Sequence, residues 1–233
     1  MKTCWLAIGL LFALCWPDAE PLAHADRPHG SWKAAKAPAP TTTPSARAWQ
    51  ASYAAEAAGK FDDALTAMTQ LPTPQRDTYL ANYRRGWLLY RTGHYAEAVT
   101  AYHTAADLAP SSIEARVAML VPLMALTKWD EVATAAQDVL KRDPNNYLAL
   151  QRLAFAKFST QHFPDAESVY RRLIQLYPSD IEMRSSLGWA TLRMGKQKEA
   201  VALFSEVLDV NPNHVSAVAG FREASKRKPQ AKL

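Results

Sequence analysis

Residues 79–112 read YLANYRRGWLLYRTGHYAEAVTAYHTAADLAPSS, and the turn in this segment occurs five times in the chain at a constant interval. Aligned on the turn, the copies share three slots. The first slot holds Gly59, Gly93, Thr127, Gln161 and Gly195, the second holds Phe61, Tyr95, Trp129, Phe163 and Gln197, and the third holds Ala64, Ala98, Val132, Ala166 and Ala200. A proline closes four of the copies, at Pro110, Pro144, Pro178 and Pro212. A period held without insertion over most of a chain indicates stacked copies of one structural unit. Such stacks usually offer extended surfaces to other proteins.

Each unit has the pattern of two antiparallel helices. In the second unit Tyr83, Trp87 and Tyr90 recur at spacings of four and three, as on one helix face. Gly93 suits a left-handed end of that helix, and Pro110 stops the helix that follows. No strand-like alternation occurs, so the sequence predicts an all-α fold of helix–turn–helix units.

The repeated block resembles the tetratricopeptide repeat family. The residue types that this family places at fixed slots occur in the second unit as Gly86, Gly93, Tyr95, Ala98, Tyr102, Ala105 and Pro110. The resemblance implies a right-handed superhelical solenoid of five repeats with a C-terminal capping helix. Small residues are expected to let the paired helices approach closely, and large rings to fill the space between units, with Gly86, Ala154 and Gly188 in the first role and Tyr102, Tyr170 and Phe204 in the second.

The expected domain organisation follows from these repeats and from the composition of the flanking segments. The second helix of the first unit is expected to be short, because Pro72 and Pro74 follow it closely. The linker is rich in Pro, Ala and Thr and has no apolar period, and the last helix would cover the open end of the final repeat. The predicted parts are a signal peptide at 1–25, a linker at 26–44, repeats at 45–78, 79–112, 113–146, 147–180 and 181–214, a capping helix at 215–226 and a basic disordered tail at 227–233.

Residues 1–25 have the features of a cleavable secretory signal. Lys2 precedes an uncharged apolar run, and the small residues before Asp26 predict cleavage after Ala25. The run is shorter than the roughly 20 apolar residues of a membrane span, so no stable transmembrane segment is expected after cleavage. Lipid attachment at Cys15 is an open alternative, although Leu14 is bulkier than the residue that such sites prefer.

Both cysteines, Cys4 and Cys15, fall within the predicted signal. The mature chain is therefore expected to have no disulfides and no thiol nucleophile. A cysteine-free exported chain fits the periplasm of a Gram-negative bacterium.

The net charge argues against a nucleic-acid partner. The formal charge is +5, with the basic excess in the two flanking segments and a nearly balanced repeat block. Nucleic-acid binding calls for a basic stripe on the folded surface. The tails could contact anionic lipid or glycan, but charged ends are more often simply solvated.

A protein or peptide partner is expected on the first helices, which line the concave groove in the resembled family. Carried over slot by slot, the predicted groove consists of Trp49, Tyr53, Tyr83, Arg84, Trp87, Tyr90, Arg91, Met124, Arg152, Phe155, Phe158, Trp189 and Arg193, with Leu80 at a further groove slot of the second unit. Aromatic and arginine side chains dominate interface energetics, so a peptide with apolar anchors is expected, with Arg84, Arg152 and Arg193 pairing with its acidic groups or carbonyls. Alternatively, these aromatic side chains serve packing.

Catalytic, metal and cofactor sites are not predicted. The sequence has no Gly-rich phosphate loop, no Gly-x-Ser-x-Gly elbow and no metal-spaced cluster. Asn146 and Asp180 are interpreted as helix caps rather than as acid–base groups. The expected function is a non-catalytic scaffold or adaptor, for which envelope or secretion-system assembly is one setting. An activator module of a cell-envelope enzyme and a lipid- or tail-tethered structural protein remain alternatives.

Overall fold

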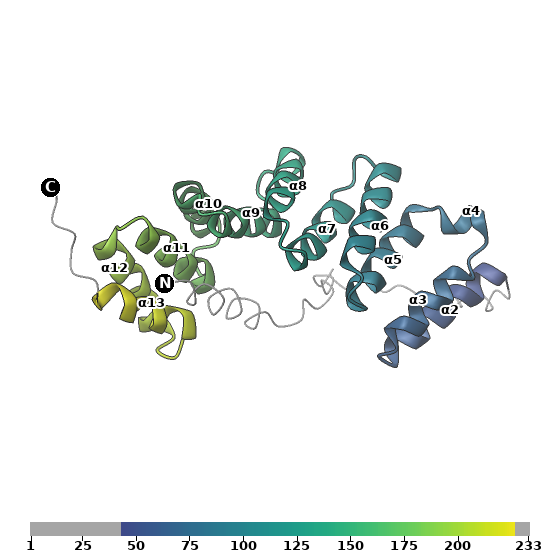
Figure 1. Ribbon diagram of the computed structural model, residues 1–233, viewed down its shortest axis with the longest axis horizontal. Helices are drawn as coiled ribbons and strands as arrows, with labels where there is room; N and C mark the ends of the chain where they lie inside the picture. Colours follow the sequence, from purple (N-terminus) through teal and green to yellow (C-terminus); the bar gives the residue numbers. More distant parts are fainter. Residues whose placement is uncertain (1–42, 227–233) are drawn as a thin grey trace, which may run out of the picture. The chain divides into compact units, whose positions relative to one another are not determined.

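The computed structural model describes residues 43–226, and within that range the chain contains twelve helices and no strand (Figure 1). The predicted signal, both cysteines, the linker up to residue 42 and the tail lie outside the described residues. The helices are α2 (Pro44–Ala57), α3 (Phe61–Thr69), α4 (Thr73–Arg76), α5 (Tyr79–Arg91), α6 (Tyr95–Leu108), α7 (Glu114–Ala125), α8 (Trp129–Arg142), α9 (Tyr147–Ser159), α10 (Phe163–Leu176), α11 (Ile181–Arg193), α12 (Gln197–Val210) and α13 (Val215–Lys226).

Ten of these helices form five pairs that stack in chain order, the short α4 lies between the first and second pairs, and α13 follows the last pair. We call α2, α5, α7, α9 and α11 the first helices, and α3, α6, α8, α10 and α12 the second helices. The core is a row of small apolar clusters rather than one centre, and each cluster draws on neighbouring pairs. This arrangement is the all-α solenoid that the repeat period predicts.

The turn between the two helices of each pair has the same backbone conformation in every copy. Positive φ angles occur at the aligned turn slot in all five pairs, at Gly59, Gly93, Thr127, Gln161 and Gly195. Glycine adopts this left-handed conformation without steric cost, whereas the β-branched Thr127 does not. The turn geometry therefore holds even where the sequence departs from glycine.

Polar side chains cap four of the five first helices, and α7, which follows Ile113, is the exception. The side-chain oxygen of Asn146 accepts a hydrogen bond from the backbone amide of Ala149 at 3.0 Å. A carboxylate oxygen of Asp180 accepts one from the backbone amide of Met183, also at 3.0 Å. The predicted capping role of these two residues is confirmed. His214 occupies the equivalent slot before α13, where its Nδ1 accepts from the amide of Ala217 at 3.2 Å.

Two boundaries at the first pair differ from the expected ones. Helix α2 begins at Pro44, inside the predicted linker, because proline fits the first turn of a helix and the Thr43 hydroxyl caps it. After the short α3, residues 73–76 form the one-turn helix α4, which the repeat pattern does not indicate. The Arg76 guanidinium fastens this turn by donating to the carbonyl oxygen of Leu71 at 3.0 Å and 3.2 Å.

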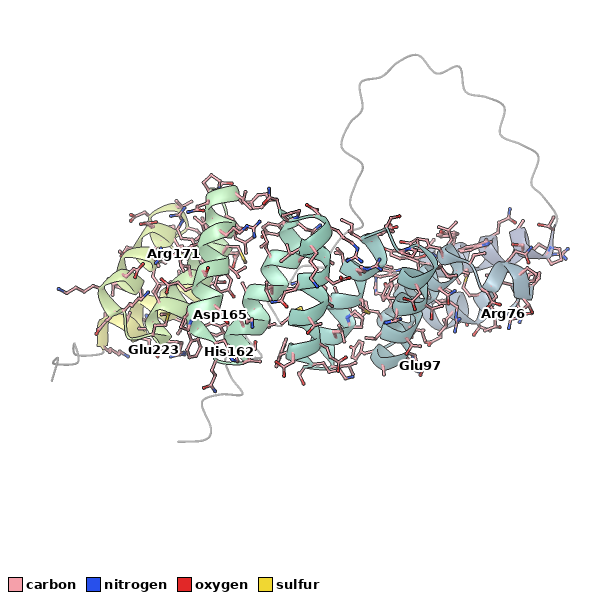
Figure 2. The ribbon with its side chains drawn as sticks, turned by 90° about the horizontal axis from the view of Figure 1, so that it is seen from above. Arg76, Glu97, His162, Asp165, Arg171 and Glu223 are labelled. Carbon is pink, nitrogen blue, oxygen red and sulfur yellow. The ribbon has the colours of Figure 1, made fainter. Side chains whose placement is uncertain are left out.

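An ion-pair network joins α10 to α12 around Glu167, which is buried. Lys196 Nζ lies 2.6 Å from Glu167 Oε2, and Arg171 Nη2 lies 2.7 Å from Glu167 Oε1. Arg171 also bridges to Glu199 on α12; Figure 2 labels Arg171 on this part of the array. Burial alone would raise the pKa of Glu167, but the hydrogen bonds from Lys196 and Arg171 outweigh it and lower that pKa.

Replacement of Gly188 tests the close approach of paired helices. A Cβ at Gly188 would lie 2.7 Å from Cε1 of Phe204, a contact that requires the ring to move. We expect Gly188→Ala to reduce the free energy of unfolding by about 1–3 kcal/mol in urea titrations, as overpacking typically does. In a protein that already carries Phe204→Leu, the added Gly188→Ala change should cost less free energy of unfolding than it does in the unmodified chain, because the ring it would meet is gone. Additive costs would contradict the steric explanation.

The Glu167 network predicts a pH dependence of stability. Because its pKa is lower in the folded state, the ionised carboxylate stabilises the fold fully above its unfolded pKa of about 4.3, and this contribution is lost as pH falls through the folded value. In Glu167→Gln the urea midpoint should be lower at neutral pH and should decline less on acidification. An unchanged pH profile in the variant would contradict this assignment.

Candidate functional site

The thirteen aromatic, arginine and methionine residues of the predicted groove all lie on first helices. Helix α2 carries two of them, α5 carries five, α7 carries one, α9 carries three and α11 carries two. The constant repeat period therefore places these side chains on successive equivalent elements. Their burial and contacts divide them into three groups, at the N-terminal, middle and C-terminal pairs.

At the N-terminal end, Arg84 is held by contacts within the chain. Its side chain is only 7% exposed, and Nη1 lies 2.8 Å from Glu56 Oε2. Its Nε donates to Ser52 Oγ at 2.9 Å, and the guanidinium lies 3.7 Å from the centre of the Tyr53 ring. Trp87 donates its indole N–H to the other oxygen of Glu56 at 3.1 Å. Glu56 thus ties α2 to two predicted groove residues of α5.

The rings of this end make pairwise aromatic contacts. Trp49 stacks with Tyr53, and Trp87 contacts Tyr90, with centroid separations of 6.1 Å and 6.2 Å. The Arg91 guanidinium lies 4.0 Å from the Phe61 ring centre. Such contacts limit the rotamers of these side chains and give this surface a fixed shape.

Tyr83 packs against the second helix of its own pair. Its ring meets that of Tyr102 edge to face at 5.5 Å, and burial together with the charge of Glu114 raises the pKa of Tyr83 to about 12. Tyr83 therefore fits the alternative interpretation, in which the predicted groove aromatics serve packing. The exposed Tyr53 does not fit it as well.

In the middle of the array, Arg152 is a buried cation. It is 7% exposed, and burial lowers its pKa to about 10, while the neighbouring Tyr147 and Tyr90 act in the opposite direction. Phe155 contacts Trp129 at a centroid separation of 5.4 Å. Phe158 contacts Phe163 at the same separation, and Met124 is half-buried against the neighbouring core cluster.

At the C-terminal end, α13 engages both predicted groove residues of α11. Trp189 is 6% exposed, and its indole N–H donates to Ser216 Oγ at 2.9 Å. Arg193 Nη1 lies 2.8 Å from Glu223 Oε1. The capping helix thus occupies the position at which the next repeat would pack, so these two residues serve the cap.

Two buried polar atoms on the first helices have no hydrogen-bond partner among the described residues. They are Nη2 of Arg84 and Oε1 of Gln151, one a donor and the other an acceptor. Gln151 uses its amide nitrogen to donate to the Tyr147 hydroxyl at 3.3 Å. A buried polar atom without a partner costs about 1–3 kcal/mol, so both mark places where water or a bound partner would be stabilising.

The most exposed large apolar side chains of the first helices agree only in part with the predicted groove. Tyr53 is 57% exposed, Leu80 67% and Leu148 37%. Tyr53 and Leu80 stand at predicted groove slots, whereas Leu148 was missed. Leu148 occupies the slot of Leu80 two repeats later, and this shared slot was a signal that could have identified it.

The described residues show no site for metal chemistry. No group of three or more His, Cys, Asp or Glu side chains within residues 43–226 could hold a metal ion. Nor is any helix in that range long and apolar enough to cross a membrane.

Comparison with known proteins identifies the repeats. Residues 79–112 and residues 123–181 each match a family model described as tetratricopeptide repeat. The peroxisomal targeting signal receptor of Saccharomyces cerevisiae is 27% identical over 115 residues, which cover 47% of this chain and 19% of the receptor. The chain thus spans about a fifth of that relative's length.

Solved structures share the fold at low sequence identity. A solved fragment of MamA from Desulfovibrio magneticus, residue 41 to the end, superposes with a TM-score of 0.66 at 18% identity, covering 72% of this chain and 95% of that fragment. YrrB, a tetratricopeptide repeat protein described as having an unusual peptide-binding site, superposes with a TM-score of 0.65 at 13% identity, covering 73% and 88% of the two chains. At these identities the likeness is one of fold.

The Arg84–Glu56 pair makes a prediction about stability. Glu56→Gln leaves a buried guanidinium without its counter-charge, so the free energy of unfolding should fall by about 2 kcal/mol; this is less than for a fully buried pair, because Glu56 still contacts water. Adding Arg84→Met should restore part of that loss. If Glu56→Gln leaves the free energy of unfolding unchanged in urea titrations, the burial of Arg84 does not depend on its ion pair with Glu56.

Proposed function

Because the chain is a tetratricopeptide repeat protein, we propose that its first helices bind a peptide segment of a partner protein through exposed apolar side chains. The fold is an interaction scaffold, and the first helices carry its largest set of aromatic side chains. The function proposed here is that of a non-catalytic adaptor.

The observation that carries this proposal is the repeated exposure of leucine at one slot. Leu80 and Leu148 are large apolar side chains left in contact with water on first helices that bury most of theirs. Tyr53 adds an exposed ring on α2, with the Arg84 guanidinium fixed against it. Exposed apolar side chains held on a rigid scaffold favour association with a partner that covers them.

The charged contacts narrow the chemistry of the partner. Arg84 and Arg193 are engaged by Glu56 and Glu223, so recognition of acidic groups by these two arginines would require breaking existing pairs. The partner segment is therefore expected to contribute aliphatic or aromatic anchors.

Export to the bacterial periplasm is part of the proposal and rests on the sequence of residues 1–25. Cleavage after Ala25 would give a mature chain that begins at Asp26 and contains no cysteine. Mass spectrometry of the mature N-terminus, with and without inhibition of lipoprotein processing, distinguishes this outcome from lipid attachment at Cys15. A role in envelope or secretion-system assembly is the setting that we propose for the adaptor.

Charge substitution at the exposed leucine slot tests the binding proposal. We expect Leu80→Glu/Leu148→Glu to reduce partner capture in pull-downs from the native host by about tenfold or more, because two apolar anchors are lost and carboxylates replace them. Both side chains are exposed, so the circular dichroism spectrum and the urea midpoint should change little.

The matched control is Leu108→Glu/Val210→Glu, which changes two exposed apolar residues at the ends of second helices. This variant should capture the same partners as the unmodified chain. Equal capture by all three proteins would contradict binding by the first helices, and loss in the control alone would move the binding surface to the ends of the second helices.

A further inference from the structure

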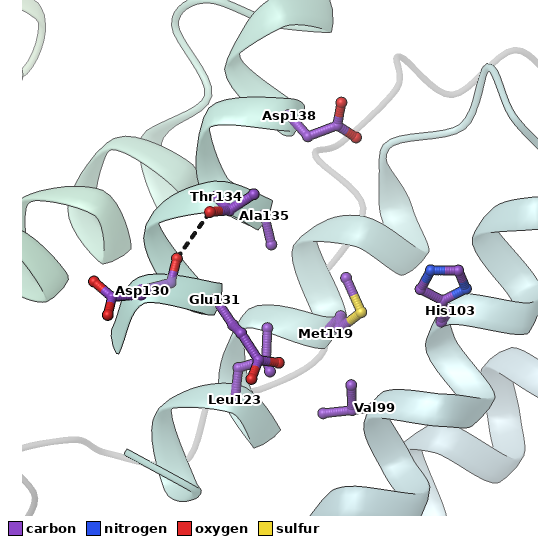
Figure 3. A pocket seen from close by; sticks show the side chains of 9 residues that line it. All are labelled: Val99, His103, Met119, Leu123, Asp130, Glu131, Thr134, Ala135 and Asp138. Atoms are coloured by element: carbon purple, nitrogen blue, oxygen red, sulfur yellow. Dashed lines mark hydrogen bonds between the residues drawn. The ribbon is translucent and has the colours of Figure 1, made fainter. Parts of the chain in front are cut away.

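A cavity of about 390 Å³ lies between the second helices α6 and α8, on a different surface from the proposed peptide site (Figure 3). Its apolar part is formed by Val99 of α6, Met119 and Leu123 of α7, and Ala135 of α8. Its polar rim is mostly acidic and comes largely from one helix: Asp130, Glu131, Thr134 and Asp138 of α8, with His103 of α6 opposite.

The junction between α10 and α12 is the equivalent place two repeats later, and an ion pair establishes the correspondence. Arg116 of α7 lies 3.1 Å from Asp138, and Arg184 of α11 lies 2.5 Å from Glu206. Arg116 precedes Arg184, and Asp138 precedes Glu206, by two repeat periods. The two junctions therefore share one geometry, and their slots can be compared directly.

At the later junction, charged side chains fill the slots that line the cavity at the earlier one. Glu167 and Arg171 occupy the slots of Val99 and His103, and Arg171 bridges to Glu199, which occupies the slot of Glu131. At the earlier junction the valine and the histidine leave Glu131 without an arginine from the preceding second helix. His103 turns instead to Asp107 of its own helix at 3.0 Å.

The acidic rim is only partly neutralised within the chain. Glu131 pairs with Lys128 at 3.0 Å in an exposed contact, and Asp138 is shared by Arg116 and Arg142. No ion pair of Asp130 occurs among residues 43–226. The Glu131 carboxylate lies beside Leu123 in the apolar part of the cavity (Figure 3). A carboxylate in this position favours a cation carried on an alkyl chain over an acidic or a purely apolar side chain.

We propose that this cavity binds an arginine side chain from a basic segment of a partner protein. The alkyl part of that arginine would lie on Val99, Met119 and Leu123. Its guanidinium would meet Glu131, as that of Arg171 meets Glu199 within the chain. The later junction thus shows, in the same protein, the kind of group that completes the earlier one.

Filling the cavity from within is the first test. His103→Arg places an arginine at the slot of Arg171 and should raise the thermal midpoint by about 1–2 °C through an ion pair with Glu131. The added Glu131→Gln change should remove that gain. The reciprocal variant Arg171→His should lower the midpoint by opening the later junction. A His103→Arg protein that is no more stable than the unmodified chain would overturn the geometric correspondence.

Binding of a defined probe is the second test. The full-length protein is titrated with the capped dipeptide acetyl-Leu-Arg-amide while the methyl resonances of Val99, Met119 and Leu123 are followed by NMR, and acetyl-Leu-Glu-amide serves as the matched control. The arginine probe should shift these resonances with a dissociation constant in the millimolar range, and the glutamate probe should not. Glu131→Gln should weaken binding about threefold, and His103→Arg should abolish it.

Equal shifts with both probes, or none with the arginine probe, would overturn the proposal. Concentration-dependent self-association of the unmodified chain that His103→Arg abolishes would also overturn it, because the occupant would then be a second copy of this chain. Retention of arginine-probe binding by Leu80→Glu/Leu148→Glu would show that this cavity acts independently of the proposed peptide site.

Discussion

The close contact between an aromatic ring and a glycine Cα is the constraint on which the rest of the structure depends. Tyr102 packs on Gly86 within the second pair, where a Cβ would come within 2.8 Å of the ring. Phe204 does the same against Gly188, and Gly220 of α13 also lies against its ring. Because packed interiors tolerate little change in volume, these contacts fix the separation of the helices in the second and fifth pairs and the position of the capping helix.

Fixed spacing within each pair determines what the first helices can present. The first helices pack one stripe against their own second helices. On α5, Arg84 and Trp87 also contact the preceding first helix α2, and on α11, Trp189 and Arg193 contact the capping helix α13. The surface that remains is small and consists mainly of Tyr53, Leu80 and Leu148 with the half-buried rings beside them. The proposed binding function rests on this remainder.

The fold followed from the sequence because its signals are local and repeated. The turn slot, the closing prolines and the caps at Asn146 and Asp180 each depend on backbone conformation within a few residues. The family matches and the observed helix pairs agree with the expected stack of helix–turn–helix units. The second helix of the first pair, α3, is short as predicted. The start at Pro44 and the turn α4 were missed because proline both ends and begins helices.

The availability of the predicted groove residues could not be predicted in the same way. It depends on contacts between side chains of successive helix pairs, such as Glu56 with Arg84 and Arg193 with Glu223, and on whether α13 covers the last pair. The same limitation hid the cavity between α6 and α8, where Val99 and His103 stand at the slots that Glu167 and Arg171 occupy at the later junction. Comparing aligned slots for charge as well as for apolar character would have indicated the difference between these two junctions.

Photocrosslinking in the native host tests the central claim most directly. A photoreactive amino acid at position 80, on the first-helix surface, is compared with the same residue at position 108, which is also exposed but lies at the end of a second helix. Binding by the first helices predicts a discrete crosslinked partner from position 80 that is absent or much weaker from position 108. The same partner captured equally from both positions, or from position 108 alone, would contradict it.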